Sequence, residues 1–226
     1  MRRAILATLL VIAAGGLTPA RAAQYGLYAG VSYAQTDREA ESAEFAAAVA
    51  NIYEDNGFTP VDSTVSFDTK DSAYGFAVGY RLFEHLAVEG GYMDLGEVAY
   101  RDRSAGLFDG TTPENWGQNI DSSTSGIALS ALAVLPLTYR LEVYARAGFL
   151  LASNEATVFI TDGVQSARFR VTKSGFDPLA GVGLTFSFFE IYNLRLEYMR
   201  VFDAGDEETL GEADTDLAML GITVSF

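Results

Sequence analysis

The sequence contains no cysteine, a single histidine and a single tryptophan among its 226 residues. Without cysteine the chain forms no disulfide, carries no thiol nucleophile and holds no metal through thiolates. Basic residues are also scarce, because 15 lysines and arginines stand against 30 aspartates and glutamates and give a formal net charge of −15. Such an acidic protein is not expected to bind nucleic acid by neutralising phosphates. Stability must therefore come from backbone pairing and side-chain packing.

Long apolar runs are missing from all of the chain except its N-terminus. A transmembrane helix needs about 20 apolar residues, and only residues 4–17 approach this length. They follow two arginines and precede the small residues of Ala20-Arg21-Ala22, which is the arrangement of a secretory signal peptide. We predict that residues 1–22 are a cleaved signal peptide and that residues 23–226 form one domain.

The rest of the chain alternates short segments of period-2 hydrophobicity with connections that are long and short in turn. Period 2 is the pattern of a β-strand with one apolar face. The rhythm of the connections predicts an all-β fold, an eight-stranded antiparallel transmembrane up-and-down β-barrel with long extracellular loops and short periplasmic turns. The expected strands lie at residues 24–35, 73–82, 86–95, 126–136, 141–152, 177–187, 192–202 and 216–226.

Six charged residues are assigned to the inside of this barrel. A charge that faces lipid near the bilayer midplane costs about 2–4 kcal/mol, so the charged face of each strand must point inward. The inward charges are balanced in sign and comprise Arg81, Glu89, Glu142, Arg146, Arg195 and Glu197. Because an eight-stranded barrel is only wide enough for its own side chains, we expect them to pair and close the lumen. A proton or ion path and a catalytic carboxylate pair are the alternatives.

Three residues do not fit this assignment of faces. Arg200 falls on an outward face, where it either reaches the outer headgroups or lies above the apolar band. Leu132 and Val134 fall on an inward face. They indicate either a partly apolar lower lumen or a local bulge.

Several segments carry a family resemblance. They are the run YGLYAGVSY from Tyr25, the run GFAVGYRLFEHLAVEGGYMDLG from Gly75, ALAVLPL from Ala131, AGVGL from Ala180 and LRLEY from Leu194. In these segments the chain resembles the OmpA-like outer-membrane β-barrel family, and the likeness spans the whole mature chain. It implies a location in the outer membrane of a Gram-negative bacterium. Larger members append a peptidoglycan-binding domain, which we do not expect here because the chain ends at Phe226.

The C-terminal strand resembles the signal that the barrel assembly machinery reads, through Gly221, Val224 and the terminal Phe226. Unpaired backbone groups are not tolerated in hydrocarbon, so this last strand is expected to pair with the first and close the barrel. Phe226 is equally compatible with membership of an aromatic girdle.

Functional contacts, if the barrel makes any, are expected in the loops. In the first loop, residues 36–72, a helix is predicted over residues 39–56, with an apolar stripe that either packs over the barrel mouth or contacts a partner or the outer leaflet. The stripe consists of Phe45, Val49, Ile52 and Tyr53. The second loop, near residues 97–125, contains Trp116 as a candidate surface anchor.

The other two long loops are charged. The third carries Arg168, Arg170 and Lys173, which either meet lipopolysaccharide phosphates or form a solvated strand extension. The fourth is acidic, but its spacing matches no dedicated calcium loop. We therefore expect neither a metal nor a cofactor.

Catalysis is not expected. The histidine, His85, lies in a short turn on the predicted periplasmic side, away from any serine in a His-x-Ser arrangement. The pairing of an oriented base with a nucleophile is not met. The sequence favours a non-enzymatic outer-membrane protein that contributes to membrane integrity and to surface interaction, with lipid, lipopolysaccharide, the assembly machinery and a host or surface protein as partners. A narrow channel is the alternative, and a soluble eight-stranded binding barrel would require the reverse distribution of charge.

Overall fold

The computed structural model describes residues 26–38, 57–68, 70–108, 110–161, 166–189, 191–206 and 211–226. The predicted signal peptide and the predicted helix at residues 39–56 lie outside the described residues. The described segments form nine antiparallel strands: β1 (Gly26–Arg38), β2 (Phe58–Asp68), β3 (Lys70–Phe83), β4 (Leu86–Phe108), β5 (Thr112–Pro136), β6 (Leu141–Thr161), β7 (Ser166–Phe188), β8 (Tyr192–Asp206) and β9 (Gly211–Ser225).

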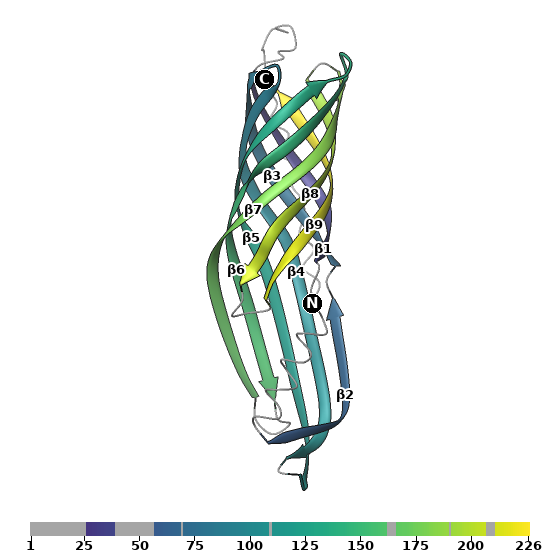
Figure 1. Ribbon diagram of the computed structural model, residues 1–226, viewed down its shortest axis with the longest axis vertical. Helices are drawn as coiled ribbons and strands as arrows, with labels where there is room; N and C mark the ends of the chain where they lie inside the picture. Colours follow the sequence, from purple (N-terminus) through teal and green to yellow (C-terminus); the bar gives the residue numbers. More distant parts are fainter. Residues whose placement is uncertain are drawn as a thin grey trace.

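Eight of these strands close into a ring, in the order β1-β3-β4-β5-β6-β7-β8-β9. The last strand pairs with the first from Tyr28 opposite Ser225 to Arg38 opposite Thr215, so the ring has no free edge in its membrane half. Figure 1 shows the strands inclined to the long axis of the barrel. The eight-stranded antiparallel barrel that the sequence predicts is thereby confirmed.

The short turns and the C-terminus lie together at one end of the barrel, uppermost in Figure 1. Glu84 and His85 join β3 to β4, residues 137–140 join β5 to β6, and β7 meets β8 at residues 189–191. This end corresponds to the periplasmic side of the predicted topology, where short turns are expected.

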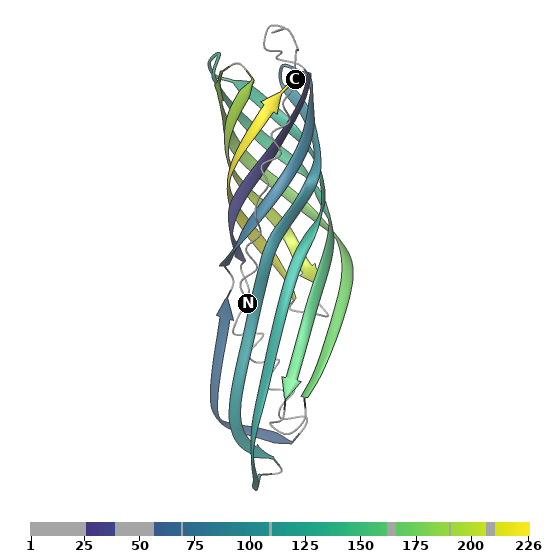
Figure 2. The same ribbon diagram turned by 180° about the vertical axis from the view of Figure 1, so that it is seen from behind.

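At the opposite end, strands β4 to β7 continue well beyond the ring, and β2 pairs with the outer half of β4 from Phe58 opposite Phe108 to Asp68 opposite Ala99. Figure 2 shows this extension from the other side, with β2 along β4. Residues near 97–125, expected as the second loop, lie mostly in β4 and β5. Arg168, Arg170 and Lys173 lie in β7, which agrees with the alternative of a strand extension. Outside the membrane both faces of a sheet can be polar, so the apolar alternation disappears although the backbone pairing continues.

Among the described residues, no helix is long and apolar enough to cross a bilayer.

The outward face of the ring is apolar between the turns and the start of the extension. Val31, Phe76 and Val182 point outward from β1, β3 and β7 and remain more than half exposed. A soluble protein would not expose a continuous belt of such side chains, whereas lipid covers them. This distribution is opposite to that of a soluble binding barrel.

Candidate functional site

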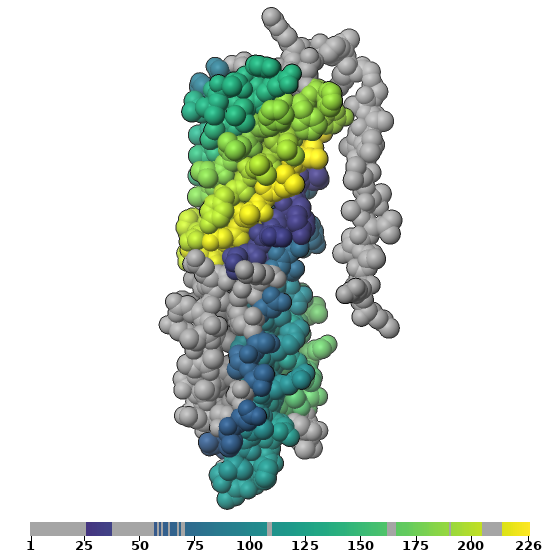
Figure 3. Space-filling view, turned by 90° about the vertical axis from the view of Figure 1, so that its right-hand side faces the viewer, coloured from purple at the N-terminus to yellow at the C-terminus, as the bar shows by residue number. Residues whose placement is uncertain are grey.

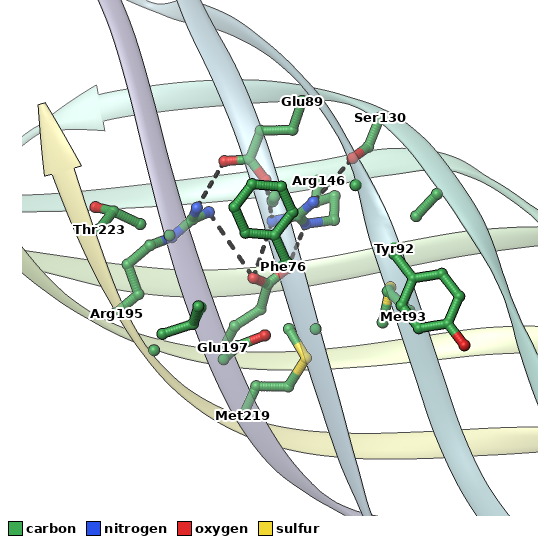
Figure 4. A pocket seen from close by; sticks show the side chains of 18 of the residues that line it. Phe76, Glu89, Tyr92, Met93, Ser130, Arg146, Arg195, Glu197, Met219 and Thr223 are labelled. Carbon is green, nitrogen blue, oxygen red and sulfur yellow. Dashed lines mark hydrogen bonds and ion pairs between the residues drawn. The ribbon is translucent and has the colours of Figure 1, made fainter. Parts of the chain in front are cut away.

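The middle of the lumen is filled by four charged side chains, which we call the charge quartet: Glu89, Arg146, Arg195 and Glu197. Arg146 contacts Glu89 through Nη2 and Oε2 at 2.7 Å and Glu197 through Nε and Oε1 at 2.5 Å. Arg195 contacts Glu89 through Nη1 and Oε1 at 2.6 Å and lies 3.8 Å from Glu197. Each guanidinium therefore lies between two carboxylates, as Figure 4 shows. Glu89 and Glu197 are buried, and the side chains of Arg146 and Arg195 are only 9% and 11% exposed.

Two tyrosines and a serine complete the hydrogen bonding of the quartet. Tyr28 donates its hydroxyl proton to Glu89 at 2.6 Å, and Tyr144 donates to Glu197 at 2.7 Å. Arg146 Nη1 donates to Ser130 Oγ at 2.8 Å. These acceptors and donors satisfy most of the groups that burial deprives of water, which is the condition under which a buried ion network is tolerated.

Glycines opposite the two tyrosines make these contacts possible. Tyr28 is in register with Gly79, and Tyr144 with Gly183. A Cβ atom on either glycine would overlap the ring of its tyrosine. Each ring therefore lies across the neighbouring strand and carries its hydroxyl to a carboxylate. Sequence reasoning did not identify Tyr28, Tyr144 or Ser130, because only the register shows which residue faces which glycine.

The remaining two predicted charges form a separate pair nearer the turns. Arg81 Nη1 donates to both oxygens of Glu142, at 2.8 and 3.0 Å. Arg81 Nη2 also donates to the backbone carbonyl of Glu84 in the adjoining turn. The structure thus places all six predicted charges inside the barrel, four in the quartet and two in this pair.

Apolar layers lie on both sides of the quartet. On the extracellular side is a cluster, which we call the apolar layer, whose largest members are Leu95, Leu150, Leu179, Met199, Val201 and Leu217. Each of these side chains is at most 3% exposed.

On the turn side, Leu132 and Val134 pack with Ala87 and Tyr144. The pairing of β5 with β6 is regular through both residues, and the pairing with β4 is regular through Leu132, so they belong to an apolar lower lumen and not to a bulge. Two cavities lie among the described lumen residues. One of about 490 Å³ lies at the turn end and reaches Arg81 and Arg195, and one of about 60 Å³ lies beside the quartet, drawn in Figure 4.

The outward Arg200 is neutralised by the neighbouring strand. Its Nε and Nη2 donate to the two oxygens of Asp216 at 2.7 Å each, and its Nη1 donates to Asp214 at 3.2 Å. Arg200 is directly opposite Asp216 in the β8–β9 register. An arginine at the outer edge of the lipid belt is tolerated here because a bidentate carboxylate balances its charge.

The residues of the predicted assembly signal lie on the closing strand. Gly221 is buried, Val224 is paired with Ala29 of β1, and the Phe226 amide donates to the Leu27 carbonyl at 2.9 Å. The four candidate contact residues of the first loop lie outside the described residues.

Trp116 does not lie in a loop as predicted. It is part of β5, where it is half-buried and donates its indole proton to Glu114 at 2.9 Å.

In the extension, Tyr100 is fully buried, and this burial together with the neighbouring charge of Asp102 raises the pKa of Tyr100 to about 12.

His85 lies in the exposed turn between β3 and β4, with Nδ1 3.1 Å from the Val134 carbonyl oxygen. Within the described part of the chain, no group of three or more metal-ligating side chains is positioned to hold a metal ion.

Comparisons with known proteins agree with this architecture. Residues 23–226 match the OmpA-like transmembrane domain family. Outer membrane protein A of Yersinia pseudotuberculosis serotype I (strain IP32953) is 29% identical over 153 residues, which are 67% of this chain and 38% of that protein. Outer membrane protein A of Shigella flexneri is 26% identical over 177 residues, which are 77% of this chain and 45% of that protein. The chain therefore spans less than half the length of these curated relatives.

Two similar solved structures are Neisserial surface protein A and Ail. The first has 11% identity and a TM-score of 0.46, over 89% of this chain and 97% of that one. Ail, the attachment invasion locus protein of Yersinia pestis, was solved in complex with the heparin analogue sucrose octasulfate. It has 13% identity and a TM-score of 0.45, over 89% of this chain and 99% of that one.

Proposed function

This chain belongs to the OmpA-like transmembrane domain family and is a β-barrel of the outer membrane, and on that premise we propose that it is a sealed, non-enzymatic barrel. Its role is to support the integrity of the outer membrane and to present an extracellular sheet for surface contacts.

The observation that supports this proposal is that two layers of side chains, one charged and one apolar, lie across the lumen. The charge quartet crosses the lumen with four ion pairs, and the apolar layer follows directly on its extracellular side. Separating a buried ion pair leaves an uncompensated charge at a cost of about 3–5 kcal/mol. Opening the layer as well would expose apolar side chains to water. These costs oppose the alternative of a narrow channel.

A catalytic role finds little support in the residues that the structure describes. His85 is exposed in a turn, and the carboxylates of the quartet are engaged by arginines and tyrosines. A base of a catalytic pair needs a nucleophile within hydrogen-bond reach and access for the substrate. The two curated relatives described above are outer membrane proteins A, which is consistent with a structural or binding role.

The barrel contacts lipid along its apolar belt. Further partners fit the proposed role: the barrel assembly machinery would read the closing strand through Gly221, Val224 and Phe226, and lipopolysaccharide or a host protein would meet the extracellular sheet. The extension supports this because β2 and the outer half of β4 pair beyond the ring (Figure 1), and the teal part of the chain reaches past β1 and β9 in Figure 3.

Membrane integrity is tested by deleting the gene and measuring uptake of a hydrophobic dye that an intact outer membrane excludes. We expect faster uptake in the deletion strain and recovery when the wild-type chain is supplied. A matched control supplies Glu155→Gln, an exposed substitution in the extension that leaves the lumen unchanged. Unaltered uptake after deletion would contradict a role in integrity.

A further inference from the structure

The outward wall of β4 to β7 changes its chemistry at a definite level. The last apolar row across these four strands, in register and exposed, consists of Tyr92, Ile127, Leu151 and Phe176. The next row toward the extracellular end consists of Asp94, Ser125, Ser153 and Ser174. Hydrocarbon cannot satisfy a carboxylate and three hydroxyls, so the lipid chains end between these two rows.

Four exposed arginines follow on the same wall, and we call them the arginine row: Arg101, Arg103, Arg168 and Arg170. Arg101 and Arg168 share one register row with Asn119 and Phe159. That row lies about eight residues beyond the last apolar row, which corresponds to roughly 20 Å above it at 3.3 Å per residue and the usual strand tilt. At this height the sugars of the outer leaflet's glycolipid surround a barrel wall.

The contacts of these arginines leave donors available. Arg101 contacts Asp121 at 3.3 Å and Arg170 contacts Glu155 at 3.1 Å, each through Nη1, while their side chains are 49% and 67% exposed. A guanidinium has five N–H donors, so one carboxylate contact does not saturate it. The Arg168 guanidinium lies 6.0 Å from the centre of the Phe159 ring. Within the described residues, neither Arg103 nor Arg168 forms an ion pair.

We propose that the arginine row binds phosphate groups on the core saccharide of neighbouring lipopolysaccharide molecules. A planar guanidinium matches phosphate with two parallel hydrogen bonds. The four arginines share this outward wall with four carboxylates, Asp94, Glu97, Asp121 and Glu155. The wall is therefore close to neutral in a chain whose net charge is −15, and Arg103 and Arg168 lie beyond these carboxylates toward the extracellular end. Serine hydroxyls between the row and the lipid boundary face the same sugars. The inference names a partner for the extracellular sheet of the proposed function, and it does not depend on the sealed lumen.

The test measures binding of the full chain, in detergent micelles at low salt, to three lipopolysaccharides by native mass spectrometry. One has a complete phosphorylated core, one has the same core with its phosphates removed, and one lacks the core but keeps the lipid A phosphates. The variant is Arg168→Gln/Arg170→Gln. The matched control is Arg140→Gln, which removes an arginine from a turn at the opposite end of the barrel.

We expect wild type to bind the phosphorylated core about tenfold more tightly than either other form, since a charge-assisted hydrogen bond contributes about 1.5 kcal/mol or more. The double variant should lose this preference, the control should keep it, and added salt should weaken it. Equal binding of the phosphorylated and dephosphorylated cores would overturn the proposal. Binding of the coreless form as tightly as the phosphorylated core would also overturn it, because recognition would then lie with lipid A.

The comparison among lipids with the wild-type protein decides the proposal even if the double variant fails to fold. A second variant, Arg168→Lys/Arg170→Lys, keeps the charge and removes the planar fork, and we expect it to bind with intermediate affinity. Loss of lipopolysaccharide binding would leave dye exclusion by the barrel unaffected, so failure of this inference and failure of the proposed function give different results.

Discussion

Neutralising Glu197 should destabilise the barrel far more than neutralising an exposed carboxylate. Its carboxylate accepts from Arg146 Nε at 2.5 Å, from Arg146 Nη2 at 3.1 Å and from the Tyr144 hydroxyl at 2.7 Å. In Glu197→Gln, Arg146 keeps Glu89, but the quartet then holds two positive charges and one negative. Breaking a buried pair costs about 3–5 kcal/mol. We expect the lower end, about 3 kcal/mol, because Arg146 retains one carboxylate.

The assay is equilibrium unfolding in urea, in detergent micelles, followed by circular dichroism and by the heat-dependent band shift of folded barrels on gels. A loss of about 3 kcal/mol lowers the folding constant by roughly two orders of magnitude. The control is Glu155→Gln, whose partner Arg170 is 67% exposed, and an exposed pair contributes about 0–1 kcal/mol.

Removing Arg146 together with Glu197, as Arg146→Gln/Glu197→Gln, restores charge balance and should recover much of the loss. The reasoning is refuted if Glu197→Gln costs no more than the control, or if the double variant loses the sum of the two single effects.

Three further predictions concern other parts of the interior. Leu150→Ala should cost about 2–5 kcal/mol in the same unfolding assay because Leu150 is fully buried, while the lipid-facing Leu151→Ala should cost much less. Equal losses would show that the apolar layer adds no stability. Gly183→Val should displace the Tyr144 ring and cost about 1–3 kcal/mol. In the double variant with Tyr144→Ala, the cost of the valine should be smaller, and strictly additive losses would show that the two side chains do not compete for space. The pKa of Tyr100 is raised from 10 to about 12 in the folded protein, so its contribution to stability is complete below pH 10 and is lost as pH rises through 12. The free energy of unfolding should therefore fall more steeply over this pH range in wild type than in Tyr100→Phe, and identical pH dependences would contradict the assignment.

The charged lumen could be predicted from the sequence because charge is excluded from lipid. Glu89, Arg146 and Glu197 each alternate with apolar neighbours, so only one parity keeps them away from hydrocarbon. The pairing partners could not be predicted, because they depend on which strands face each other across the lumen.

The apolar layer and most of the extension escaped prediction, although a strand extension around Arg168 and Arg170 was one of the two alternatives. Leu150 shares its strand face with Arg146, so parity places it inside, but the sequence does not show which residues of the other strands meet it in one layer. Beyond the membrane, β5 carries polar residues on both faces, so nothing in the pattern distinguishes a strand from a loop. Burial and backbone pairing, which no single segment encodes, determine both features.

The central claim is that the lumen is closed, and single-channel recording in planar lipid bilayers tests it most directly. Folded wild-type protein is recorded beside the charge reversals Arg81→Glu and Glu89→Arg. The account predicts no current steps from inserted, heat-modifiable wild-type protein. Regular steps in wild type, with an amplitude or ion selectivity that the reversals change, would establish a pore and contradict the sealed barrel.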